Sequence, residues 1–208
     1  MSFPADPFLS AIESRVSCYG LRKESPILNT RLEGIIRSII QHAPSAFNVQ
    51  STRAVILLED DHEALWDVAD SCLKEGVSEG AYAYLSRGIV GFKRAYGTVL
   101  FFEDEAALEA LGSKNASVSH MVAEWSHHSN GMHQVLVWTA LQLEGLGCNL
   151  QHYNFVPSFG DEVRQRWKIP DTWSLQAQLV FGAPEAGLVR KRERTYLPIE
   201  GRLVVFGA

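Results

Sequence analysis

Residues 15–21, with the sequence RVSCYGL, combine side chains that can hold a phosphate group. The guanidinium group of Arg15 can bind two phosphate oxygens at once, and the hydroxyl of Ser17 can donate a further hydrogen bond. Judged from its position alone, Arg15 is more simply interpreted as a solvated arginine at the end of an N-terminal helix. The phosphate function is therefore one of two hypotheses for this residue.

Residues 44–50, with the sequence PSAFNVQ, lie just before an expected strand. The amide side chains of Asn48 and Gln50 each carry donors and acceptors, so they suit the edge of a heterocycle or a row of hydroxyl groups. The alternative is a loop that closes the preceding helix, in which Ser45 and its neighbours make only local bonds to the backbone.

Residues 145–154, with the sequence GLGCNLQHYN, form the third segment with chemical potential. Gly145 and Gly147 lack the third glycine of a dinucleotide-binding loop and follow an expected helix, so they predict a helix C-terminus. His152, which follows Leu150 and Gln151, could act as an acid because an unperturbed imidazole has a pKa near 6.5.

Several common chemistries lack their sequence motifs. The chain contains neither a GxxxxGK[ST] loop nor a GxSxG elbow. Four histidines share one region, but no two have the i,i+4 spacing that would place both on one metal ion, so we expect a polar helix face and no metal site. They are His120, His127, His128 and His133.

Charge and cysteine content limit the partners and the compartment. The net charge of −5 opposes a nucleic acid as the main partner, although the basic run at 190–194 can hold a small anionic ligand. Three cysteines without CxxC spacing disfavour a disulfide framework. The N-terminus has neither a basic region nor an apolar run, and no apolar stretch is long enough to span a bilayer. We therefore expect a cytoplasmic protein that does not cross a membrane.

Hydrophobic periodicity and capping signals predict interspersed helices and strands. Helices are expected from Asp6, where a capping side chain precedes proline, from a capping box at Thr30, and from Asp60. Further helices are expected at about 79–96, 118–146 and 161–167, and strands at 52–58, 98–102, 148–152, 175–181 and 203–206. Gly131 predicts a break or a close contact within the long helix. This irregular order predicts one α+β domain, residues 1–208, with a central mixed sheet.

Four stretches, taken in order, resemble the nitroreductase-like superfamily. They are PSAFNVQ at 44–50, GTVLFFED at 97–104, a helix with SNGM and VWTAL at 129–141, and LQHYN at 150–154. The similarity covers nearly the whole chain and is to the branch that contains the fungal fatty-acid-repression-mutant proteins and the copper-induced bacterial nitroreductase. It implies the nitroreductase fold, a mixed but mainly antiparallel central sheet flanked by helices, with the C-terminal strand exchanged in a homodimer.

The resemblance also implies bound FMN, with the phosphate contacts on Arg15, Ser17 and Arg194. Arg192 is a weaker candidate, and the alternative for both later arginines is a basic surface loop. The implied cofactor-binding residues are Arg15, Val16, Ser17, Tyr19, Pro44, Ser45, Asn48, Gln50, Leu150, Gln151, His152 and Arg194. The implied residues of a substrate pocket or dimer helix, for which ordinary helix packing is the alternative, are Trp125, Ser129 and Met132.

Two positions depart from the pattern of the family. Val16 stands where relatives often have a second basic residue, and Tyr19 stands where many have arginine or lysine. Nearby cations could supply the missing charge. The candidates are Arg22, Lys23 and Arg53.

The activity implied by the resemblance is that of an FMN-dependent NAD(P)H oxidoreductase with ping-pong kinetics. NADH or NADPH would reduce the flavin and leave, and a nitroaromatic or quinone-like acceptor would then enter the same pocket. We assign no catalytic residue, because flavin chemistry needs no protein nucleophile. Two alternatives keep the fold: a flavin-binding regulatory protein in lipid or redox signalling with incidental turnover, and a structural dimer that has lost FMN.

Overall fold

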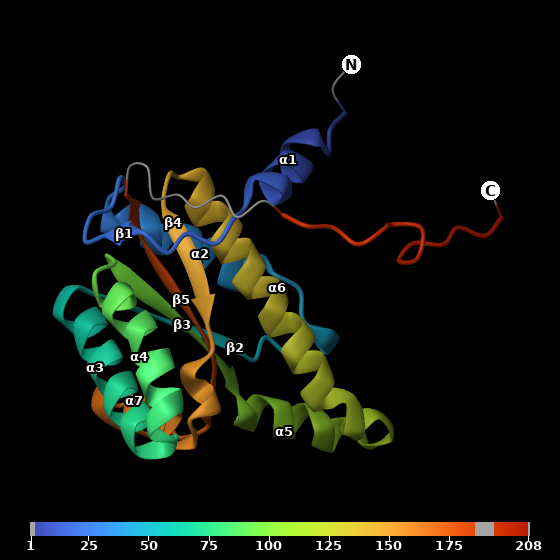
Figure 1. Ribbon diagram of the computed structural model, residues 1–208. Coiled ribbons are helices and arrows are strands. Elements are labelled where there is room, and N and C mark those ends of the chain that lie inside the picture. The colour runs from blue at the N-terminus through green and yellow to red at the C-terminus, as the bar shows by residue number, and fades with distance from the viewer. Residues whose placement is uncertain (1–2, 186–193, 208) are drawn as a thin grey trace.

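The computed structural model describes residues 3–185 and 194–207, in which helices and strands alternate irregularly (Figure 1). The helices are α1 (Asp6–Ser14), α2 (Asn29–His42), α3 (Glu59–Gly76), α4 (Glu79–Lys93), α5 (Glu105–Lys114), α6 (Val122–Leu143) and α7 (Pro157–Trp167). The strands are β1 (Leu21–Arg22), β2 (Thr52–Leu58), β3 (Gly97–Asp104), β4 (Gly147–Gln151) and β5 (Trp173–Pro184). Single-turn or short 3₁₀ helices are η1 (Ala46–Asn48), η2 (Ala116–Met121) and η3 (Tyr153–Phe155).

Strand β5 is the centre of the sheet. It pairs with β3 along one edge and with β4 along the other, while its end pairs with the short β1. Strand β2 pairs with β3 from Thr52–Glu103 to Leu58–Gly97 and forms an edge of the sheet. All these ladders are antiparallel, and an isolated parallel bridge joins Ser17 to Cys148. The expected α+β architecture with a mainly antiparallel sheet is confirmed.

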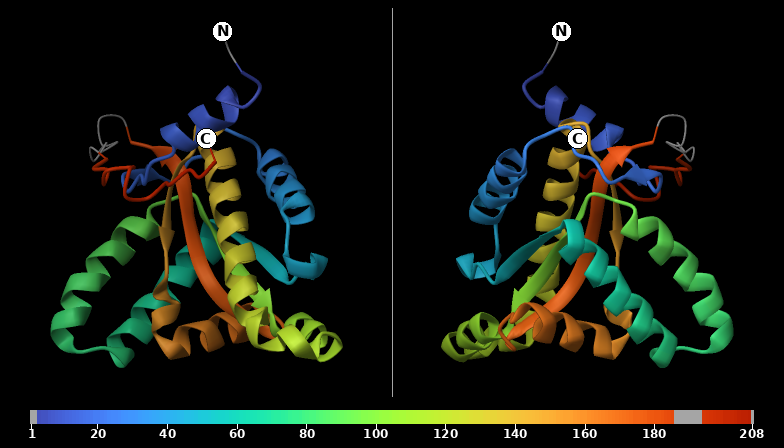
Figure 2. Two further views of the ribbon diagram at one scale, coloured as in Figure 1. Left: turned by 90° about the vertical axis from the view of Figure 1, so that its right-hand side faces the viewer. Right: turned by 90° about the vertical axis from the view of Figure 1, so that its left-hand side faces the viewer.

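Two hydrophobic cores lie on opposite faces of the sheet. Because side chains alternate along a strand, β3 sends Val99 and Phe101 into one core and Leu100 and Phe102 into the other. Helices α2 and α6 cover the first face, and α3, α4 and α7 cover the second (Figures 1 and 2). Every residue of β3 except its last is buried, so both faces of this strand are covered by the rest of the protein.

Some sequence predictions need correction. The long helix is α6 preceded by η2, and it continues through Gly131, whose missing side chain faces open space, so neither a break nor a close contact occurs there. Helix α2 begins at Asn29 and its N-cap residue is Leu28, whose side chain has no hydrogen-bond acceptor, so the capping box expected at Thr30 is not formed. Helix α5 was not predicted.

The expected strand at 203–206 is absent from the single chain. This apolar run lies on an arm that leaves the body of the protein and pairs with none of the described strands (Figure 1). Its side chains are largely exposed, up to 91% for Phe206. A strand needs a ladder partner, and within the described part of one chain this segment has none.

No helix of the described chain combines the length and apolar character that crossing a membrane requires.

A buried histidine connects α3 to the sheet. The Nε2 atom of His62 lies 3.0 Å from the carbonyl oxygen of Phe92, which can only accept, so Nε2 carries the proton and Nδ1 accepts from the Thr98 hydroxyl at 2.9 Å. The Thr98 hydroxyl in turn accepts from the indole of Trp66. Burial lowers the pKa of His62 to about 4.

We predict that His62 makes the protein acid-sensitive. Its pKa is about 6.5 in the unfolded chain and about 4 in the folded chain, so its contribution to stability is complete above pH 6.5 and is lost as the pH falls toward 4. The loss should reach about 3 kcal/mol. Denaturant unfolding at pH 7 and pH 4.5 should show a smaller loss for His62→Gln than for the wild type. His120→Gln, an exposed control, should behave as the wild type does. Equal pH dependence for all three proteins would contradict the assignment.

Candidate functional site

The end of α1 is clamped to the C-terminal turn of α6. Gln142 donates from Nε2 to the carbonyl oxygen of Ser14 at 2.7 Å and accepts at Oε1 from the amide of Val16 at 2.8 Å. Between these two contacts, the guanidinium carbon of Arg15 lies 4.2 Å from the centroid of the Trp138 ring. The backbone of residues 14–16 is therefore fixed and Arg15 is stacked on α6.

The following residues run along β4. The amide of Cys18 donates to the carbonyl oxygen of Cys148 at 2.8 Å, and the buried amide of Asn149 donates to the carbonyl oxygen of Cys18 at 2.8 Å. A side chain at Gly147 would lie within 2.9 Å of the sulfur of Cys18, so only glycine fits this approach. Gly145 adopts a φ of +87° and ends α6, which confirms the predicted helix C-terminus.

A second guanidinium group lies at the same corner. Arg194 donates from Nη1 to the carbonyl oxygen of Glu13 at 3.0 Å, and its Nη2 is buried without a hydrogen-bond partner among the described residues. Burial, and to a smaller extent the positive charge of Arg194, lowers the pKa of Arg15. Neither arginine forms an ion pair within the described chain, and Ser17, two residues after Arg15, is exposed. We call Arg15, Ser17 and Arg194 the arginine corner. Its cations lack an anion, and this donor set fits a phosphate group.

The sequence departures in this region are not offset by nearby charge. Val16 is half-buried and Tyr19 is 62% exposed. The three cations considered as substitutes already have carboxylate partners. The pairs are Arg22–Glu24 at 3.0 Å, Lys23–Glu63 at 2.6 Å and Arg53–Asp104 at 2.9 Å. Arg192 lies outside the described residues.

The loop at 44–50, between α2 and β2, has an unusual backbone. Phe47, Asn48 and Gln50 have φ values of 52°, 53° and 50°, in the left-handed region that side chains disfavour. The hydroxyl of Ser45 accepts from the amide of Gln50 at 2.9 Å. Pro44, Asn48 and Gln50 are exposed, and the Gln50 Nε2 atom also donates to the carbonyl oxygen of Asn48 at 3.5 Å, so both side-chain amides lie at the surface of the loop.

The end of β4 forms the third segment. Leu150 is half-buried, and Gln151 turns its side chain back to Asn149, donating at 2.8 Å. The buried Gln178 accepts from the amide of Tyr153 at 2.7 Å and so fixes the turn at His152. The His152 ring remains partly exposed, and its partial burial lowers its pKa.

The three candidates on α6 have different surroundings. The ring of Trp125 lies 5.7 Å from that of Phe47 and so contacts the 44–50 loop. Ser129 is buried and donates to the carbonyl oxygen of Trp125 at 3.0 Å, within its own helix. Met132 is exposed on the outer face of α6.

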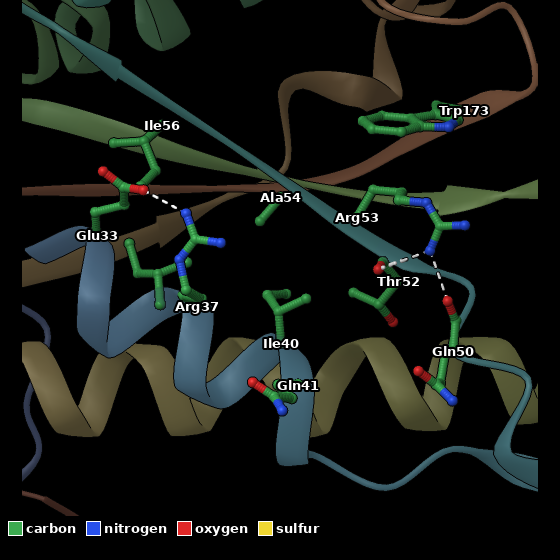
Figure 3. Close-up of a pocket in the computed structure, with 11 residues that line it drawn as sticks. Glu33, Arg37, Ile40, Gln41, Gln50, Thr52, Arg53, Ala54, Ile56 and Trp173 are labelled. Carbon is green, nitrogen blue, oxygen red and sulfur yellow. Dashed lines mark hydrogen bonds and ion pairs between the residues drawn. The ribbon is translucent and has the colours of Figure 1, made fainter.

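The structure brings the predicted residues together as two groups. Ser17 of the arginine corner bridges to Cys148 in β4, the strand that leads to residues 150–152, whereas the 44–50 loop lies on the opposite side of α6 (Figures 1 and 2). No set of three or more metal-ligating side chains gathers within the described residues. A groove of about 500 Å³ lies beside the 44–50 loop, between α2 and the edge strand β2, and Gln50 is one of its lining residues (Figure 3).

Sequence analysis missed the residues that hold these groups in place. Gln142 and Trp138 position the arginine corner, and Glu103 and Asn130 form a buried network behind the 44–50 loop. The one available signal was the acidic pair Glu103–Asp104 at the end of a strongly apolar strand, where carboxylates need partners.

Comparison with known proteins identifies the class. Residues 12–183 match the nitroreductase family, so the chain belongs to this family of oxidoreductases. It is 35% identical over 188 residues to the nitroreductase FRM2 of Saccharomyces cerevisiae, covering 88% of this chain and 91% of the yeast protein.

Solved structures agree with this assignment. The nitroreductase CinD of Lactococcus lactis, in complex with 4-nitrophenol, superposes with a TM-score of 0.82 at 34% identity, covering 96% of this chain and 99% of CinD. A Desulfovibrio desulfuricans protein in complex with FMN shares the fold, with a TM-score of 0.67 at 18% identity, covering 99% of this chain and 98% of that protein.

Proposed function

We propose that this chain is an FMN-dependent NAD(P)H oxidoreductase that reduces nitroaromatic or quinone-like acceptors with ping-pong kinetics. The observation that carries the proposal is the buried Nη2 of Arg194, which lacks a partner in the described chain and lies at a corner with Arg15. A buried charged donor without a partner is costly, and a phosphate of charge −1.5 to −2 would satisfy it. Family membership, the FMN bound by one protein of this fold and the 4-nitrophenol bound by CinD add support.

Different residues of this chain would bind the different parts of FMN and the acceptor. Arg15, Ser17 and Arg194 would hold the phosphate, with the backbone of Val16 and the side chain of Tyr19 beside them. FMN, when bound, supplies hydride acceptance from NADH or NADPH and reduction of the acceptor. Residues 150–152 would lie along the flavin ring, and the exposed amides of Asn48 and Gln50, with Pro44 and Ser45, would bind its polar edge. Trp125 and Met132 would border the acceptor.

A homodimer would complete this arrangement. The two groups of candidate residues lie on opposite sides of α6, so one site would take the arginine corner from one chain and the 44–50 loop from the other. Apolar side chains are exposed along α1, at Phe8, Leu9 and Ile12, and on α6 at Met132 and Val135. These unpartnered faces favour a second copy of the chain.

The C-terminal arm has a matching acceptor in this proposal. One edge of β2 is unpaired within the described chain. The groove beside this edge is lined in part by the apolar side chains of Ile40, Ala54 and Ile56 (Figure 3). The exposed apolar run at 203–206 of a partner would add a strand there, burying both surfaces.

Turnover tests the proposed activity. The purified holoprotein should oxidise NADH or NADPH in the presence of 4-nitrophenol or a quinone, with parallel double-reciprocal plots because the reductant leaves before the acceptor binds. Stopped-flow absorbance of the flavin bands would measure the first half-reaction. A flavin-loaded protein that neither nucleotide reduces would instead favour a regulatory flavin-binding protein.

Arg15→Ala tests the arginine corner. Losing a charged hydrogen-bond donor typically costs about 1.5–3 kcal/mol, so FMN affinity should fall roughly 10- to 150-fold in a fluorescence titration of the apoprotein. The apoprotein should not lose stability from electrostatics, since Arg15 faces another cation. Arg166→Ala is a matched control, because Arg166 also stacks on a tryptophan, with its guanidinium carbon 5.4 Å from the ring centroid of Trp167 on α7. Equal FMN affinity for Arg15→Ala and the control would show that Arg15 does not bind the phosphate and is a solvated surface arginine.

Truncation after Pro198 tests the arm. Removing the apolar run should weaken both the dimer and flavin retention, which light scattering and the flavin-to-protein absorbance ratio would measure. Val204→Asp should act in the same direction, because it places a charge within the run, while Glu200→Gln should not. A truncated protein that stays dimeric and fully loaded with FMN would rule out the exchanged arm.

A further inference from the structure

A carboxylate is buried behind the 44–50 loop. Glu103, near the end of β3, is 1% exposed, and all its side-chain partners in the described chain are uncharged. It accepts from the hydroxyls of Ser51 at 2.5 Å and Thr52 at 2.7 Å, and from the amide of Asn130 at 2.7 Å. Burying a carboxylate without a cation costs free energy, so the three donors must be held in place to compensate it.

The loop that precedes these donors is strained. Five non-glycine residues of the described chain have positive φ values, and three of them are Phe47, Asn48 and Gln50. Such conformations persist only where the surrounding structure imposes them, and they concentrate at functional sites. The loop therefore needs an external restraint.

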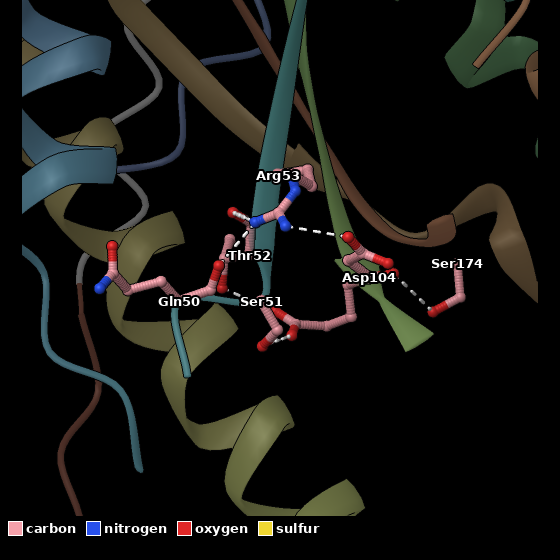
Figure 4. A network of polar contacts seen from close by, with 7 residues as sticks. Gln50, Ser51, Thr52, Arg53, Asp104 and Ser174 are labelled. Atoms are coloured by element: carbon pink, nitrogen blue, oxygen red, sulfur yellow. Dashed lines mark hydrogen bonds and ion pairs between the residues drawn. The ribbon is translucent and has the colours of Figure 1, made fainter. Parts of the chain in front are cut away.

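Two adjacent carboxylates provide that restraint from different sides. Asp104 binds Arg53 at 2.9 Å, and Arg53 donates to the carbonyl oxygen of Gln50 at 2.6 Å (Figure 4). The amide of Asp104 also donates to the carbonyl oxygen of Ser51 at 3.0 Å. Glu103 holds the next two residues through their hydroxyls. The chain is consequently fixed where the loop enters β2. The carbonyl oxygens of Gln50 and Ser51 and the hydroxyls of Ser51 and Thr52 are all held by hydrogen bonds.

The same network reaches α6. Asn130 donates to Glu103 and to the carbonyl oxygen of Phe102, at 3.2 Å, and it accepts from Gln134 at 2.7 Å. Five residues earlier on the same helix, Trp125 packs against Phe47. Glu103 thus joins the end of the loop to the helix that contacts its middle.

We propose that Glu103 is a positioning residue of the flavin site: its buried carboxylate, linking Ser51 and Thr52 to Asn130, holds residues 47–50 in the strained conformation that presents the Asn48 and Gln50 amides. The inference rests on the proposed function, because it concerns the affinity of that site for FMN. Glu103 does not itself touch the ligand; it acts through the loop.

The test compares Glu103→Gln with Glu105→Gln. Both remove a charge, but Glu105 is exposed, and among the described residues its side chain accepts a hydrogen bond from Ser174 alone, at 2.5 Å. Glu103→Gln should weaken FMN binding to the apoprotein about tenfold, equivalent to one charge-assisted hydrogen bond. In the absence of FMN, amides at 46–51 should exchange with solvent at least about tenfold faster, while protection in α3 stays unchanged. Glu105→Gln should alter neither quantity.

A second variant covers the case in which Glu103→Gln fails to fold. Ser51→Ala removes one donor and keeps the carboxylate, so it should shift affinity and loop exchange in the same direction by a smaller factor. Wild-type affinity and wild-type loop exchange in both folded variants would overturn the inference while the proposed function stands, as would faster exchange spread evenly over the protein. A wild-type protein that does not bind FMN would overturn the proposed function and this inference together.

Discussion

Strand β3 has no solvent face, and the positions of the other elements follow from this burial. Its alternating side chains enter both cores, so helices must cover both sides of the sheet and strands must pair with both of its edges. The strand also delivers Glu103 and Asp104 to the point where its apolar run ends. Two carboxylates at the margin of a fully apolar layer have to recruit polar partners, and the partners available are the first residues of β2 and the middle of α6.

Helix α6 sets the distances between the candidate residues. It contacts the 44–50 loop through Trp125 and the arginine corner through Trp138 and Gln142. The 17 residues from Trp125 to Gln142 correspond to roughly 25 Å of helix. A ligand the size of a mononucleotide is shorter than this spacing. For that reason the proposed sites combine the corner of one chain with the loop of another.

The sequence predicted the elements with strong periodicity and missed those with weak signals. The β-branched run at 52–58 became β2 with the predicted bounds, whereas α5 buries only Leu108 and offers little pattern to detect. The three site segments could be found because their residue types are local. The Glu103–Asn130 contact could not, since it joins residues 27 positions apart that only the fold brings together. The exposed arm at 203–206 has no partner among the described strands, and the strand exchange that the resemblance implies for it stays a prediction.

The stacking of Arg15 on Trp138 gives this protein an optical property. The Trp138 indole is largely buried, its nitrogen lacks a hydrogen-bond partner in the described chain, and the guanidinium carbon of Arg15 lies 4.2 Å from the centroid of its ring. Indole emission responds to a nearby positive charge. Any event that draws Arg15 away from the ring, such as the arrival of an anion, therefore changes the fluorescence of a residue that the anion itself need not touch.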